Sequence, residues 1–138
     1  MEFDTILCHY AEVGLKLGNR RFFENWLRQN IKAALNRAIP DKKFTVRRLF
    51  GRIMVELDDD PIKNQEEITQ ALSSTFGLAY FAFAKYVVQE IKGIREMALV
   101  ALQDKEFDTF KIKTRRPDQQ FLFTAQQVNE DVGAFILS

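Results

Sequence analysis

Residues 44–57 read FTVRRLFGRIMVEL and predict a β-hairpin. The two halves of this stretch, residues 44–49 and 52–57, are rich in β-branched and apolar residues, which favour strands. Only Phe50 and Gly51 separate them, and a short connection that contains glycine is typical of a hairpin turn. The hairpin therefore supplies two adjacent antiparallel strands around which the first part of the chain can be arranged.

A strand and a helix are predicted before this hairpin. The apolar run Phe3–Tyr10 indicates a strand in which Cys8 packs as a small apolar residue, and Asn19 is the expected cap of a helix over Arg20–Ala38. Helical spacing gives this helix an apolar face and a polar face. The predicted apolar face comprises Phe22, Phe23, Trp26, Leu27, Ile31, Ala34 and Leu35, and the predicted polar face comprises Arg21, Glu24, Arg28 and Lys32.

A second helix and a fourth strand follow the hairpin. Asn64 with Glu67 three residues later predicts a helix start, and Gly77 is the expected glycine at its C-terminal cap. The aromatic-rich stretch 78–88 predicts the strand. The resulting order of strand, helix, strand, strand, helix, strand is that of a ferredoxin-like domain over residues 1–88.

Residues 89–138 predict a second, smaller α/β unit. Apolar spacing indicates a helix over residues 90–103, and Thr124 with Gln127 predicts a capping box at the start of a last helix. Between these helices lies a single predicted strand, and a lone strand cannot satisfy its backbone groups. The expected fold class is therefore α+β, with a ferredoxin-like domain followed by an α/β unit that is incomplete at Ser138 or borrows strands from elsewhere.

The predicted strand of this unit carries a concentration of positive charge. Four cations occupy six positions of the run KIKTRRPD, residues 111–118, in a chain whose formal net charge is +1. Phe110, Ile112 and Thr114 alternate with them, a period of two that turns one face of a strand to a core. Pro117 ends the strand because it has no N–H to donate. The candidate phosphate ligands are Lys111, Lys113, Arg115 and Arg116.

Two observations point to anion binding, and a solvated strand face is the alternative. The start of the Thr124 helix follows the cations, and backbone N–H groups at a helix start favour an anion. Guanidinium groups bind phosphate with two parallel hydrogen bonds, which places Arg115 and Arg116 first among the candidates. Asn129 on the same helix is a candidate for a contact to the bound ligand, with a solvent-facing position as the alternative.

Lys16, Arg20 and Arg21 form a second candidate phosphate site. These residues flank a loop containing Gly14 and Gly18 at the predicted start of the first helix. The alternative is that the glycines only shape a turn.

Composition excludes several other functions. One cysteine allows no internal disulfide or multi-cysteine metal site, and no apolar run approaches the length of a membrane span. With His9 as the only histidine, no catalytic or metal-binding constellation is visible. We expect a cytoplasmic protein without a cofactor or catalytic residue in this chain, and without a membrane partner.

Two motifs carry a family resemblance. Residues 113–121 (KTRRPDQQF), continuing through Thr124, Asn129 and Gly133, resemble the signature of the THUMP domain, an RNA-binding module of tRNA-modifying enzymes. Residues 12–23 (EVGLKLGNRRFF) resemble the opening of the tRNA 4-thiouridine synthetases, which are also grouped with thiamine biosynthesis. In that branch a ferredoxin-like domain precedes the THUMP domain. The family often has lysine where this chain has Gln119 and arginine where it has Glu130, which bears on RNA affinity.

The resemblance implies that the chain binds the acceptor region of tRNA and presents it to a separate catalytic domain. That domain would use ATP and magnesium for sulfur transfer and would follow residue 138, so the chain looks like the N-terminal piece of a tRNA sulfurtransferase or a shortened relative. The rival expectation is a protein interaction module that forms a homodimer through unpaired strand edges. Steep loss of RNA binding with salt distinguishes the first from the second.

Overall fold

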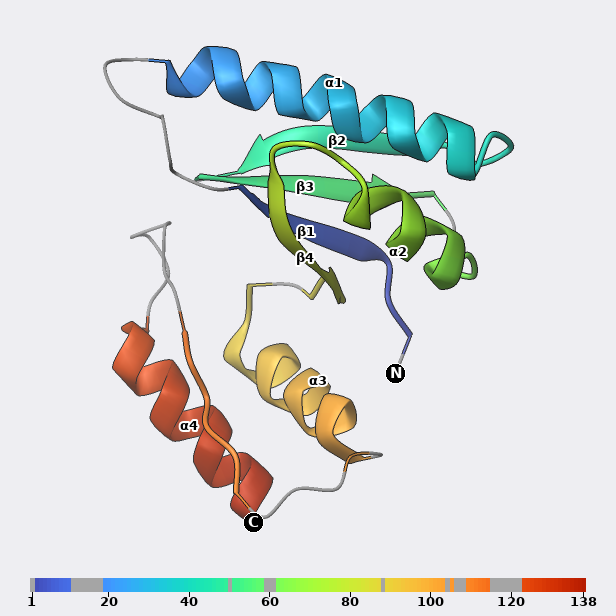
Figure 1. Ribbon diagram of the computed structural model, residues 1–138. Helices are drawn as coiled ribbons and strands as arrows, with labels where there is room; N and C mark the ends of the chain where they lie inside the picture. Colours follow the sequence, from blue (N-terminus) through green and yellow to red (C-terminus); the bar gives the residue numbers. More distant parts are fainter. Residues whose placement is uncertain are drawn as a thin grey trace. The chain divides into compact units, whose positions relative to one another are not determined.

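The computed structural model describes residues 2–10, 19–49, 51–58, 62–87, 89–103, 105, 109–114 and 123–138. Residue contacts divide the chain into two compact units, Glu2–Tyr86 and Val87–Ser138. Each unit has its own packed elements, shown in Figure 1.

The first unit is a four-stranded antiparallel sheet with two helices packed on it (Figure 1). The sheet has the strand order β2-β3-β1-β4, so the N-terminal strand is central. The elements in chain order are β1 (Thr5–Tyr10), α1 (Arg20–Ala38), β2 (Phe44–Leu49), β3 (Arg52–Leu57), α2 (Gln65–Ser73) and β4 (Leu78–Ala84). This is the predicted ferredoxin-like order, which confirms the fold class of this unit.

The core of this unit lies between the sheet and the helices. Alternate residues of β1, Ile6 and Cys8, are fully buried and face the same core as Ile31 of α1 and Ile68 of α2. The buried side chains that alternate along the strands thus pack against the apolar faces of the helices. Burial raises the pKa of the Cys8 thiol to about 12, so this group stays protonated at neutral pH and is a packing residue, as predicted.

The hairpin forms at the predicted residues. Leu49 of β2 pairs with Arg52 of β3, and Gly51 in the turn has a φ of 82°, which favours glycine. β4 is shorter than predicted and ends at Ala84 rather than at residue 88. Its pairing with β1 ends there, because Thr5, at the start of β1, is opposite Ala84.

Three predicted caps differ from the structure. Asn19 and Asn64 occupy N-cap positions, but neither side chain makes a capping hydrogen bond. α2 ends at Ser73 with Ser74 as its C-cap, so the prediction that Gly77 caps this helix is wrong. Gly77 lies in the turn before β4 with a φ of 93° and packs against α1. Glycine is needed there by the turn and by the close approach of α1.

Two residues of α1 lie on the opposite side from the one predicted. Phe22, predicted to be in the core, is 76% exposed, whereas Glu24, predicted to be on the polar face, is 5% exposed. The Glu24 carboxylate accepts a hydrogen bond from the Tyr10 hydroxyl at 2.9 Å and lies 3.3 Å from Nε of Arg48. These partners satisfy the carboxylate and so permit its burial.

The second unit pairs two helices, α3 (Ile91–Gln103) and α4 (Ala125–Leu137). Arg95 of α3 joins them, because its guanidinium lies 5.1 Å from the centre of the Phe135 ring and 3.7 Å from the Asp131 carboxylate. The predicted capping box is present: the Thr124 hydroxyl accepts from the Gln127 N–H at 3.1 Å, and the Gln127 side chain accepts from the Thr124 N–H at 2.8 Å.

The predicted basic strand does not form a strand pair in its described part. Residues 109–114 belong to no sheet, although their exposure alternates as predicted, with Phe110, Ile112 and Thr114 half-buried. The segment lies along α4 instead (Figure 1), and Ile112 and Thr114 contact that helix. Packing against α4 partly buries the apolar side chains of residues 109–114, but it does not provide the backbone hydrogen bonds of a paired strand.

No helix in the described part of the chain combines the length and apolar character needed to cross a membrane. The described residues also contain no cluster of three histidine, cysteine, aspartate or glutamate side chains that could hold a metal ion.

Candidate nucleic-acid interface

The basic segment is attached to α4 through its half-buried side chains. The Thr114 hydroxyl donates a hydrogen bond to Oδ1 of Asn129, one helical turn before Gly133. A Cβ added at Gly133 would lie 3.9 Å from Cγ1 of Ile112, which is ordinary van der Waals contact. Contacts to α4 on one side of the segment therefore leave Lys111 and Lys113 on the other side.

Lys111 and Lys113 are exposed, and neither forms an ion pair with a described carboxylate. Two uncompensated ammonium groups two positions apart in the sequence create a local positive potential. Arg115 and Arg116, the other two cations predicted for this site, lie outside the described residues. The structure thus places two of the four predicted cations together.

The side chain of Asn129, predicted as an RNA contact, is engaged within the unit. Its Oδ1 accepts the bond from Thr114, and the residue is half-buried. Asn129 therefore helps to hold the basic segment on α4. The capping box at the start of α4 satisfies the Gln127 N–H and leaves Ala125 and Gln126 as backbone donors without a described partner.

We expect Gly133→Ala to raise the free energy of unfolding by about 0.5–1 kcal/mol. Alanine has the higher helix propensity, and the added methyl group would meet Ile112 at contact distance without overlap. Urea unfolding followed by circular dichroism measures the change. If this variant is instead less stable, a neighbouring group must approach the backbone of α4 at Gly133 more closely than Ile112 does.

Only part of the second predicted phosphate site lies among the described residues. Arg20 and Arg21 are exposed in the first turn of α1, which contains no acidic residue, while Lys16 lies outside the described part. Two cations at a helix start oppose the helix dipole. An anion near this turn would relieve that repulsion.

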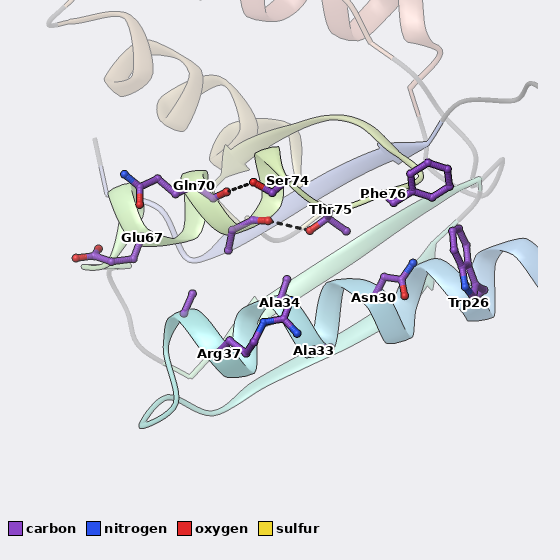
Figure 2. A pocket seen from close by; sticks show the side chains of 12 residues that line it. Trp26, Asn30, Ala33, Ala34, Arg37, Glu67, Gln70, Ser74, Thr75 and Phe76 are labelled. Atoms are coloured by element: carbon purple, nitrogen blue, oxygen red, sulfur yellow. Dashed lines mark hydrogen bonds between the residues drawn. The ribbon is translucent and has the colours of Figure 1, made fainter.

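One groove lies between α1 and α2 (Figure 2) and has a volume of about 770 Å³. At one end Trp26 and the 78% exposed Phe76 form an edge-to-face pair with ring centres 5.6 Å apart. At the other end Arg37 and Glu67 bring opposite charges to the rim. Because these charges offset each other, the groove is a poorer phosphate site than the basic segment.

A second groove of about 690 Å³ lies between α1 and β2, an edge strand of the sheet. Arg28 and Lys32 line it together with two amide side chains. The sequence placed both cations on a polar helix face but gave no sign of a groove, because β2 lies beside this face only after folding. No local sequence pattern could have identified it.

Comparison with known proteins matches both units of the chain to protein families. Residues 5–82 match the model of the ThiI ferredoxin-like domain, and residues 87–138 match the model of the THUMP domain. Curated relatives include proteins named probable tRNA sulfurtransferase from Moorella thermoacetica, 33% identical over 99% of this chain, and from Thermoanaerobacter sp., 37% identical over 97% of it. The chain spans 33% of the length of each relative.

Solved structures resemble the chain in fold. The crystal structure of PH1313 from Pyrococcus horikoshii matches 97% of this chain and 44% of its own chain, with a TM-score of 0.80 and 25% identity. A structure described as a 4-thiouridine synthetase–RNA complex with bound ATP matches 99% of this chain and 33% of its own, with a TM-score of 0.72 and 24% identity. The chain therefore belongs to the family in which a ThiI ferredoxin-like domain is followed by a THUMP domain.

Proposed function

We propose that this chain is the tRNA-binding part of a tRNA sulfurtransferase, a 4-thiouridine synthetase. The names of the curated relatives and the THUMP match over residues 87–138 support this function. The observation that carries it is the pair of exposed, uncompensated ammonium groups of Lys111 and Lys113 on that domain. The proposed domains are residues 1–88 and 89–138, a division supported by the contact boundary between Tyr86 and Val87.

The proposed mechanism is recognition without chemistry in this chain. Lysine and arginine side chains neutralise backbone phosphates, which fixes the position of the RNA but carries little sequence information. In this proposal Arg115 and Arg116 bind phosphates together with Lys111 and Lys113. Lys16, Arg20 and Arg21 provide a separate phosphate contact on the ferredoxin-like domain, and the acceptor region of the tRNA is the part bound. Catalysis with ATP and magnesium belongs to another domain, in the cytoplasm.

The double variant Lys111→Gln/Lys113→Gln tests the proposal. We expect its affinity for a tRNA transcript to fall roughly 10-fold and the slope of log K against log salt to become shallower by about two, one for each lost phosphate contact. Filter binding at several salt concentrations measures both. The variant Lys92→Gln/Lys105→Gln is the matched control, because it removes the same charge from two exposed positions of the same unit.

Two further results would contradict the proposal. Equal affinity and equal salt slope for both variants would remove the basic segment from the interface. Self-association that is insensitive to salt, without affinity for tRNA, would favour a homodimerisation module instead.

Competition by an acceptor-stem minihelix, and none by an anticodon-arm hairpin of equal length, would establish the acceptor region as the part bound.

A further inference from the structure

The groove between α1 and β2 has the polar lining of an anion site. Its polar side chains are those of Arg28, Lys32, Asn25, Gln29 and Thr45, and its apolar ones those of Phe44 and Val46. Among the described residues, no carboxylate lines it. The side chains of arginine and lysine offer donors and no acceptor, so the groove has an excess of hydrogen-bond donors with positive charge.

Two hydrogen bonds hold the side chain of Arg28, which lines this groove. Its Nη2 donates to the Val46 carbonyl at 3.1 Å, and its Nη1 lies 3.4 Å from Oδ1 of Asn25. Its Nε atom is buried and has no hydrogen-bond partner among the described residues. The guanidinium forms no ion pair with a described carboxylate, so an anion bound in the groove would compensate its charge.

Lys32 lies one helical turn beyond Arg28 on the same side of α1. The rise of an α-helix places these residues about 6 Å apart along the axis, and Arg21 precedes Arg28 by two turns on the same stripe. Lys32 and Arg21 are exposed, and neither pairs with a described carboxylate. The stripe therefore presents three cations in a row along one side of the helix.

The hydrogen bonding of β2 makes an added protein strand an unsuitable ligand for this groove. β2 is an edge strand, and added strands bind to the free backbone groups of such edges. Here the guanidinium of Arg28 already occupies the Val46 carbonyl. A ligand that brings acceptors and negative charge, rather than backbone donors, suits what remains exposed.

We propose that the groove between α1 and β2 binds the phosphodiester backbone of RNA and is a second contact surface, located on the ferredoxin-like domain. This inference rests on the proposed function and adds to it the groove between α1 and β2, which continues the contact at Arg20 and Arg21 along α1. Arg28 and Lys32 bind neighbouring phosphates of one strand, and Arg21 continues the contact along the helix. The surface recognises charge and spacing rather than bases.

Protection of Lys32 from acetylation tests the location directly in the full chain. We expect tRNA to slow acetylation of Lys32 at least about 5-fold, because a bound phosphate covers the ammonium group. Lys63, exposed before α2, serves as the internal control and should react at an unchanged rate. Inorganic phosphate at the concentration of tRNA phosphate should protect neither lysine. Equal protection of Lys32 by inorganic phosphate would overturn the RNA assignment in favour of a small-anion site.

Matched double variants test the contribution to binding. We expect Arg28→Gln/Lys32→Gln to weaken tRNA binding roughly 10-fold and to reduce the salt slope by about two, as for any two lost phosphate contacts. The control Arg37→Gln/Lys63→Gln removes equal charge from the same unit but outside this groove, and should change affinity less than about 2-fold. If the first variant fails to fold, Lys32→Gln alone, compared with Arg37→Gln alone, provides the same test at one contact.

The outcomes separate this inference from the proposed function. If Lys111→Gln/Lys113→Gln weakens binding while Arg28→Gln/Lys32→Gln does not, the α1/β2 groove is not an RNA contact and the proposed function stands. If the unaltered chain binds no tRNA, the proposed function fails and this inference fails with it.

Discussion

Replacing Glu24 with alanine is expected to lower the free energy of unfolding by about 3 kcal/mol. The carboxylate is buried and bonded to the Tyr10 hydroxyl and to Nε of Arg48. Alanine removes both bonds and leaves a cavity beside β1. Breaking one side of a buried ion pair costs about 3–5 kcal/mol, and the 40% exposure of the Arg48 side chain moves the expectation to the lower end. Urea unfolding measures the loss.

Glu24→Gln separates charge from hydrogen bonding. Glutamine fills the same volume and can accept from Tyr10, so we expect a smaller loss of about 1–2 kcal/mol. Combining Glu24→Gln with Arg48→Met completes a double-mutant cycle, whose coupling energy reports the ion pair alone. A Glu24→Ala variant as stable as the unaltered chain would mean that this buried carboxylate contributes nothing net to folding.

Gly77→Ala is expected to destabilise the first unit by a similar amount, about 3 kcal/mol. A φ of 93° is unfavourable for any residue with a side chain, at about 1–2 kcal/mol. The new Cβ would also lie only 3.1 Å from Trp26 Cζ3 and 3.3 Å from Leu27 Cδ1. Since both atoms belong to α1, the helix or its side chains must shift, which adds a further cost of about 1–3 kcal/mol.

Gly51→Ala is the control for Gly77→Ala. Gly51 also has a positive φ, of 82°, but the nearest atom to an added Cβ is the Tyr10 hydroxyl at 4.0 Å. This variant should therefore show the backbone cost alone, about 1 kcal/mol. The difference between the two variants in urea unfolding measures the packing of α1 against the turn. Equal losses would show that α1 yields to the extra methyl group without cost.

The hairpin and the long helix were predictable because their signals are local. A glycine between two apolar stretches specifies the β2–β3 turn, and the apolar spacing specifies α1 over residues 20–38. The same applies to the capping box at Thr124, in which both partners lie within one helical turn. These predictions held because the residues that specify each feature are close together in the sequence.

Two predictions failed because they depended on partners that are distant in the sequence. The caps expected at Asn19 and Asn64 are local, and there the side chains do not make the capping hydrogen bond. Periodicity placed Glu24 on the polar face, but Tyr10 and Arg48, from two strands, make its burial favourable. Gly77 was assigned to a helix cap because glycine is common there, whereas its neighbours in α1 are the reason that only glycine fits the turn. Such partners come together only in the folded chain.

The sequence predicted the alternating pattern of the candidate interface, but it did not predict which element the basic segment packs against. Alternation between exposed lysines and half-buried residues was visible in the sequence and recurs in residues 109–114. Its partner is α4 rather than a neighbouring strand, and the bond between Thr114 and Asn129 shows how the segment is fixed. Arg115 and Arg116 lie outside the described residues, so their roles remain part of the proposal.

The central position of β1 in the sheet bears on the order in which the first unit assembles. Thr5 pairs with Glu56 on one side and with Ala84 on the other. During synthesis the first strand to leave the ribosome must therefore wait for both of its neighbours, the second of which is made last. Until β4 arrives, the backbone N–H and C=O groups along one edge of β1 lack their strand partner, so the nascent unit depends on α1 and the hairpin for its early stability.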